Sequence, residues 1–103
     1  MMEKRRAFNP GDWVSTFTGQ TGVVVSETEL AGAQKILKEG KRPGHYFAPG
    51  CCHHPDYLIQ VPVIFEDGRY DVMRAMNLRR TTDIPPEKRA RLNELTADVL
   101  KEV

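Results

Sequence analysis

The chain has 103 residues, which is the size of one domain with a small hydrophobic core. An apolar fraction of 40% and a charged fraction of 28% are typical of a globular protein and exclude a mostly disordered chain. The formal net charge of +1 lacks the strongly basic balance of many nucleic-acid-binding domains. With no apolar stretch of ~20 residues and no signal-peptide segment, we expect a cytoplasmic protein without a membrane partner.

The first predicted structure is a β-hairpin that follows a flexible basic arm over residues 1–8. A turn at residues 9–12 contains a proline and a glycine. Residues 13–18 favour a strand and would place Trp13 and Phe17 on one face. A glycine turn at 19–22 and a valine run at 23–25 complete the predicted hairpin.

A helix is predicted next, over about residues 27–38. Ser26 and Glu29 have the spacing of a capping box, in which each side chain satisfies a free backbone N–H at a helix start. Leu30, Ala33 and Leu37 recur at helical spacing, and Gly40 would end the helix. The irregular segment that follows, 39–56, contains three prolines and three glycines, so a functional loop is expected there.

A second hairpin is indicated by the alternating strand from Tyr57 to Phe65 and by the turn around Asp67 and Gly68. Pro62 lacks a donor and predicts an edge or a bulge in the first strand. Residues 75–77 predict a tight turn before a last short strand at 78–81. Most of the aromatic residues in these strands fall on inward-facing positions, so we expect most of them in the core: Trp13, Phe17, Tyr57, Phe65 and Tyr70.

A C-terminal helix is predicted over 83–103, with Asp83 as its cap and prolines in its first turn. This charged helix carries an apolar stripe of four residues: Leu92, Leu95, Val99 and Val103. The stripe either packs on the domain, or the helix extends from the domain and the stripe binds another chain. The oligomeric state stays open.

This order of elements resembles the SH3-like barrel, whose fourth and fifth strands are joined by one tight helical turn. The segment from Pro10 to Val14, with Gly11-Asp12-Trp13-Val14, and the segment Thr21-Gly22-Val23-Val24 are similar to the start of KOW, CarD-like and Tudor-like barrels. The resemblance covers about 10–81 without the insertion at 26–56. It implies a mainly β (α+β) domain over 9–82: a five-strand barrel with a helix inserted between strands 2 and 3, followed by the C-terminal helix.

One candidate site is a metal site in the irregular loop. Cys thiolates and His nitrogens are good ligands for zinc, and Cys51, His54 and His45 are the best-spaced candidates in the sequence. The separated pairs of standard zinc motifs are absent. The alternatives are a loop in which these side chains act separately, and a Cys nucleophile activated by a neighbouring His.

The second candidate site is a basic surface that binds nucleic acid or a protein partner. Phosphate contacts would use the arginines and lysines, and loop aromatics would stack on bases. The alternative is a solvated face, because Glu66, Asp67, Asp71 and Asp83 interleave with the basic residues. The candidate residues are Arg74, Arg79, Arg80, Lys41, Arg42, Tyr46 and Phe47.

The sequence holds no phosphate-binding glycine loop, nucleophile elbow or paired-carboxylate motif. We therefore predict a non-catalytic binding or adaptor domain that contacts protein or nucleic acid and needs no cofactor. A zinc-type metal-binding domain is the first alternative, and a small enzyme or enzyme accessory subunit is the second.

Overall fold

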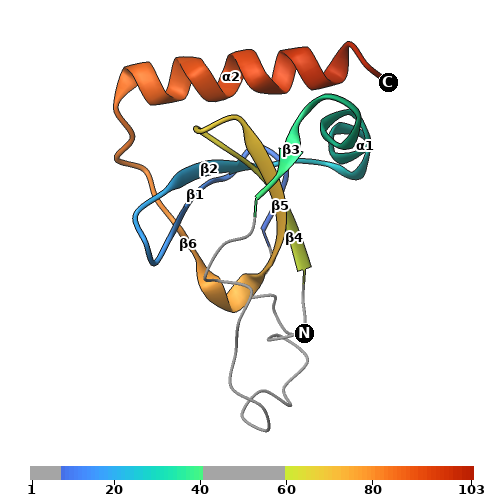
Figure 1. Cartoon of the computed structure of the whole chain (residues 1–103). Coiled ribbons are helices and arrows are strands. Elements are labelled where there is room, and N and C mark those ends of the chain that lie inside the picture. Colours follow the sequence, from blue (N-terminus) through green and yellow to red (C-terminus); the bar gives the residue numbers. More distant parts are fainter. Residues whose placement is uncertain (1–7, 41–59) are drawn as a thin grey trace, which may run out of the picture.

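The computed structural model describes residues 8–40 and 60–103 as a small α+β domain, in which two helices cover one side of a twisted sheet (Figure 1). The strands are β1 (Trp13–Thr16), β2 (Thr21–Val24), β3 (Lys38–Glu39), β4 (Gln60–Phe65), β5 (Arg69–Arg74) and β6 (Leu78–Arg80). The helices are α1 (Glu27–Ile36), the one-turn 3-10 helix η3 (Ala75–Asn77) and α2 (Pro86–Leu100). None of the described helices is both long and apolar enough to cross a membrane.

The six strands form one sheet in the order β3-β5-β4-β2-β1-β6. All neighbours are antiparallel except β3, which pairs in parallel with β5 through Lys38 opposite Arg69. The prediction of five strands therefore missed β3, and the two edge strands β3 and β6 do not pair within the described residues. The sheet is consequently not a closed barrel, and the SH3-like relationship stays a prediction.

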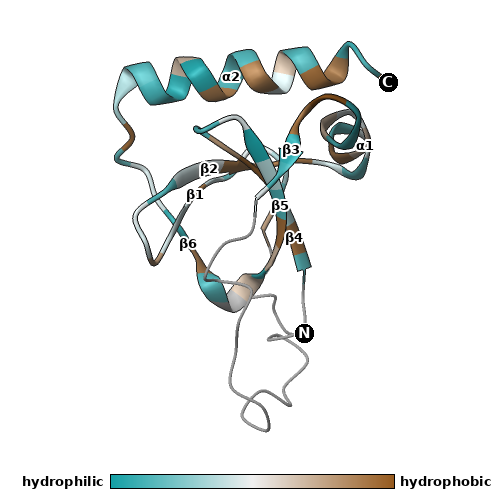
Figure 2. Cartoon of the chain, viewed as in Figure 1, coloured by the Kyte–Doolittle hydropathy of each residue, from teal (hydrophilic) through white to brown (hydrophobic). Residues whose placement is uncertain are grey.

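Each face of the sheet buries its own group of apolar side chains. The inner cluster lies on the concave face and consists of Val14, Val24, Val61, Val63, Phe65, Met73, Ala75 and Leu78. The outer cluster lies between the sheet and the helices and consists of Val23, Val25, Ala33, Ile64, Leu92, Leu95 and Val99. Apolar segments of the sheet and of both helices face one another in Figure 2, and α2 thus packs on its own domain.

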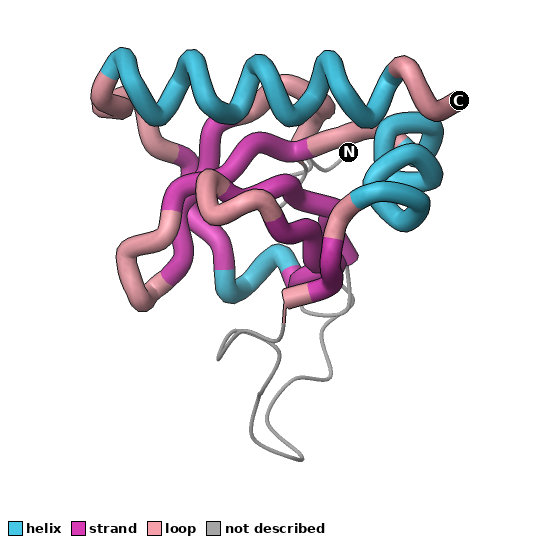
Figure 3. Tube along the Cα trace, turned by 45° about the horizontal axis from the view of Figure 1, so that its top comes forward, coloured by secondary structure: helices cyan, strands magenta, loops and turns pink. Residues whose placement is uncertain are grey.

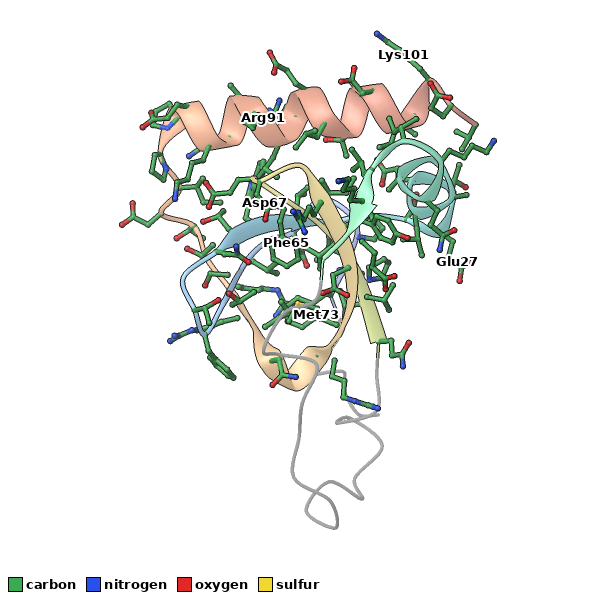
Figure 4. The ribbon with its side chains drawn as sticks, viewed as in Figure 1. Glu27, Phe65, Asp67, Met73, Arg91 and Lys101 are labelled. Atoms are coloured by element: carbon green, nitrogen blue, oxygen red, sulfur yellow. The ribbon has the colours of Figure 1, made fainter. Side chains whose placement is uncertain are left out.

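The alternation along β4 supplies both clusters, as its sequence pattern predicts. Val61, Val63 and Phe65 enter the inner cluster, whereas Ile64 enters the outer one. Phe65 and Met73 are drawn pointing into the space enclosed by the strands (Figure 4). Pro62 is tolerated in this central strand because β2 ends beside it: its carbonyl still accepts from the Val25 N–H at 3.0 Å.

The helix α1 begins with the predicted capping box. The Glu29 N–H donates to Ser26 Oγ at 3.1 Å, and the Ser26 N–H donates to Glu29 Oε1 at 2.8 Å. The helix ends at Ile36, earlier than the predicted 38, because the chain becomes extended at Leu37 and continues into β3. The Gly40 N–H then donates to the Tyr70 carbonyl at 2.8 Å, which ties the end of this segment to β5.

The helix α2 begins at Pro86 with Pro85 as its N-cap and no side-chain cap, so the prediction that Asp83 caps it is wrong. Pro85 already has the extended backbone of an N-cap, and Pro86 lacks the N–H that a cap would satisfy. Three residues of the predicted stripe, Leu92, Leu95 and Val99, are buried. The fourth, Val103, follows the end of the helix and is exposed.

At two positions, another segment of the chain passes so close that only glycine fits. At Gly22 on β2, a Cβ atom would lie 2.6 Å from Val63 Cγ1 and 2.9 Å from the Ile64 carbonyl oxygen. At Gly32 on α1, it would overlap the carbonyl oxygen of Val99 on α2. The glycine in the Gly-x-Val pattern and the glycine inside the helix thus have the same physical reason, which is the absence of space for a side chain.

Candidate functional site

Many of the predicted site residues belong to one segment. The three metal candidates, Cys51, His54 and His45, lie outside the described residues, and so do Lys41, Arg42, Tyr46 and Phe47. Tyr57 of the predicted core lies outside them as well. Within residues 8–40 and 60–103, no three His, Cys, Asp or Glu side chains gather as metal ligands would.

The three predicted arginines are arranged around η3. Strand β5 ends at Arg74, which is the N-cap residue of η3, and β6 starts directly after η3 with Leu78. A 3-10 helix rises by about 2 Å per residue, so this turn separates the two strands by only about 6 Å along its axis. Figures 1 and 3 both place η3 at the end of the sheet that is remote from α2. Arg74, Arg79 and Arg80 therefore flank one end of the domain.

Arg80 is engaged in contacts within the domain. Its Nε atom lies 3.5 Å from Asp12 Oδ2, and its guanidinium carbon lies 4.8 Å from the centre of the Phe8 ring. Phe8 in turn packs against the inner cluster, and Arg80 pairs across the sheet with Val14 of that cluster. Arg80 thus contacts the residues that precede β1. It is therefore a weaker candidate for binding a partner than the sequence suggests.

Replacing Arg80 with alanine is expected to lower the free energy of unfolding by about 1 kcal/mol, since it removes a surface ion pair and a cation–π contact. Thermal unfolding should show the midpoint about 4–8 °C lower. The matched control is Arg79→Ala on the same strand, which should change stability by less than about 0.5 kcal/mol. Equal losses of stability in the two variants would show that the contacts of Arg80 with Asp12 and Phe8 do not stabilise the domain.

Arg79 is in a different environment from its neighbour. It lies opposite Ser15 on β1, on the face that alternates away from Val14 and the inner cluster. Its side chain is exposed, and it makes no hydrogen bond or ion pair within the described part of the chain. Among the predicted arginines, Arg79 is therefore the one best placed to reach a partner.

The prediction for Phe17 was wrong. Phe17 is 66% exposed, although we predicted it on a core face together with Trp13. Strand β1 ends at Thr16, and Phe17 begins the turn to β2, where the alternation of the strand no longer applies. The cross-strand pair of Thr16 and Leu78 places Phe17 next to the end of η3.

The turn that carries Phe17 is held by the buried hydroxyl of Thr16. Thr16 Oγ1 accepts from the Gln20 N–H at 3.2 Å and from the Thr18 N–H at 3.3 Å, and it lies 2.9 Å from Thr18 Oγ1. The Gly19 N–H donates to the Thr16 carbonyl at 3.0 Å, and Gly19 adopts a φ of 89°. These bonds fix the turn on both sides of Phe17, so the exposed ring projects from an ordered backbone.

We call Phe17, Arg74 and Arg79 the η3 surface. The sequence identified its two arginines but not its aromatic residue. A signal for Phe17 was present in the sequence, because Thr16, Thr18 and Gly19 are typical of a turn whose hydroxyls bond the backbone. The strand propensity of residues 13–18 outweighed that signal.

The prediction for Asp71 was also wrong. We expected it among the surface carboxylates that offset the basic residues, but it is fully buried on β5. It lies opposite Val63 and alternates with Met73, which puts it on the face of the inner cluster. Its Oδ1 atom accepts from the Val72 N–H at 2.8 Å. Asp71 therefore lies in the interior of the domain and is not one of the exposed carboxylates that we expected.

Comparison of the chain with protein-family models, with curated proteins and with solved structures yields no match.

Proposed function

We propose that this chain is a non-catalytic binding domain of the SH3-like type that contacts its partner through the η3 surface. The observation that carries the proposal is the exposure of Phe17 on a turn fixed by Thr16. Exposed aromatic residues that need no further ordering are favourable anchors for binding, because little conformational entropy is lost when the partner arrives. The adjacent Arg79 adds a charge that no described residue neutralises.

The SH3-like part of the proposal is supported by the connection of the strands. Strand β1 pairs with both β2 and β6, and β5 passes to β6 through the single 3-10 turn η3. That is the connection expected between the fourth and fifth strands of such a barrel. The helix α1 lies between β2 and β4, at the position predicted for the insertion.

The proposal is tested by photo-crosslinking in the native cell with p-benzoylphenylalanine in place of Phe17. A matched control carries the same photoreactive residue in place of Leu100, which is also apolar and 47% exposed but lies at the end of α2. We expect a discrete crosslinked species at position 17 and none at position 100. The same adducts at both positions, or none at position 17, would refute a binding role for the η3 surface.

A further inference from the structure

We infer, on the basis of the proposed function, that the partner of the η3 surface is a protein with an uncharged, apolar pocket that takes up the ring of Phe17. The turn between β1 and β2, residues 17–20, would then be the central contact. Three properties of this turn point to such a partner: it carries no charge, its backbone donors are used within the domain, and it is narrow and ordered.

The turn lies in a segment of the chain without charged side chains. No Asp, Glu, Lys, Arg or His occurs between Asp12 and Glu27, although charged residues make up 28% of the sequence. The carboxylate of Glu66, which accepts from the Thr21 N–H at the end of the turn, is paired with Lys88 at 3.2 Å. The buried centres of protein interfaces are likewise poor in charge and rich in aromatic residues. An uncharged pocket is therefore complementary to this turn.

The backbone of the turn already uses its donors. The N–H groups of residues 18–21 all donate within the domain: the first three to the hydroxyl and carbonyl oxygens of Thr16, at 3.0–3.3 Å, and the fourth to Glu66 Oε2 at 3.1 Å. A partner therefore cannot use these groups to place an anion or to add a strand. Burial of the apolar ring is the main contribution that remains for binding.

The turn is also narrow, and its ring projects from an ordered backbone. Figures 1 and 3 show the connection between β1 and β2 as a narrow loop that extends beyond the sheet. Phe17 is 66% exposed on this loop, and bonds to Thr16 hold the backbone beside it. A single ring on a narrow projection can enter a concave site but offers little area to a flat one. Because the backbone is ordered beforehand, little conformational entropy is lost on insertion.

These properties favour a protein pocket over a nucleic acid. An unpaired base could stack on Phe17, but half or more of the contacts that proteins make to nucleic acids go to phosphate and sugar. The phosphates beside a stacked base would meet a turn that has no cation and whose N–H groups are already bonded. An apolar pocket needs neither of these groups, so the ring alone can anchor it.

The test is competition for the adduct that forms at position 17. The full-length chain with p-benzoylphenylalanine in place of Phe17 is crosslinked in an extract of the native cell, and purified unlabelled variants compete with it. The measured quantity is the competitor concentration that halves the yield of the adduct. For the unsubstituted chain, we expect this concentration to change less than about 2-fold between about 50 and about 500 mM KCl, whereas each phosphate contact would raise it about 5- to 8-fold.

Three replacements of Phe17 test the chemistry of the pocket. Phe17→Ala should raise the half-inhibition concentration about 30-fold or more, as loss of a central buried anchor does. Phe17→Leu should raise it less than about 10-fold, because leucine keeps most of the apolar volume although it has no π-face. Phe17→Lys should not compete, since it would place an unpaired charge in the pocket. The matched control is Leu100→Ala, which removes an exposed apolar side chain from the end of α2 and should compete as the unsubstituted chain does.

Two results would overturn the apolar pocket. The first is an adduct that nuclease digestion removes, and the second is a Phe17→Leu variant that competes as poorly as Phe17→Ala, which is the result expected for base stacking. Thermal unfolding midpoints of all Phe17 variants should match that of the unsubstituted chain, so that loss of folding does not explain a loss of competition.

This inference and the proposed function fail in distinguishable ways. If position 17 forms a discrete adduct that nuclease removes, or that Phe17→Leu and Phe17→Ala compete for equally poorly, the η3 surface remains a binding surface and only the apolar protein pocket is refuted. If position 17 forms no adduct, both are refuted. A nuclease-resistant adduct for which Phe17→Leu competes and Phe17→Ala and Phe17→Lys do not would support both.

Discussion

Replacing Gly32 with alanine is expected to destabilise the domain, although alanine is the better helix former by about 1 kcal/mol. The new Cβ atom would overlap the Val99 carbonyl oxygen and lie 2.9 Å from its carbonyl carbon. Backbone atoms of a helix cannot rotate away as a side chain can, so α1 and α2 would have to separate along the outer cluster. Overpacking of this kind costs about 1–3 kcal/mol or more, and we expect the upper end of that range.

The net loss for Gly32→Ala should therefore be about 2 kcal/mol, seen as a fall of about 8–16 °C in the thermal midpoint. Gln34→Ala serves as the control, because Gln34 is exposed on the same helix and its replacement should change stability by less than about 0.5 kcal/mol. A Gly32→Ala variant as stable as the unsubstituted chain would show that the helices cross with more space than the structure gives.

Phe65→Ala is expected to have the largest effect of any single substitution considered for this chain. Phe65 is 0% exposed, is the largest of the fully buried side chains among residues 8–40 and 60–103, and belongs to the inner cluster. Removal of a buried phenylalanine ring costs about 3–5 kcal/mol. A domain of this size is stabilised by only about 5–15 kcal/mol in total, so the variant should be partly unfolded well below the normal midpoint.

Phe17→Ala is the matched control for that experiment. Both residues are phenylalanines of predicted β-structure, but Phe17 is 66% exposed. Its removal should leave urea unfolding within about 0.5 kcal/mol of the unsubstituted chain. If both variants lost several kcal/mol, Phe17 would be packed against the domain and the η3 surface would lose its aromatic anchor.

The parts of the fold that the sequence predicted well are those fixed by neighbouring residues. The capping box of α1 uses residues three positions apart, and both of its hydrogen bonds are present. The second hairpin depends on Asp67 and Gly68: the Gly68 N–H donates to the Phe65 carbonyl at 3.0 Å, and Gly68 has a φ of 85°. The alternation along β4 correctly predicted which side chains face each cluster, because successive residues of a strand point to opposite faces whatever the rest of the chain does.

The parts that the sequence predicted poorly depend on contacts between distant segments. Strand β3 has only two residues, Lys38 and Glu39, and exists because β5 is beside it. The burial of Asp71 follows from its place opposite Val63 in the sheet, which its charge could not indicate. The exposure of Phe17 depends on where β1 ends, and that point is set by pairing with β6 as well as by the turn.

The pairing of β1 with β6 has a consequence for the order in which the domain folds. The hairpin of β4 and β5 closes a short turn and can form within about 1–10 μs, whereas Val14 must find Arg80 across most of the domain. Such non-local pairing is typical of proteins that fold in milliseconds to seconds. We expect the bonds of Arg80 to Asp12 and Phe8 to form after the rate-limiting step, so that Arg80→Ala accelerates unfolding and leaves the refolding rate nearly unchanged.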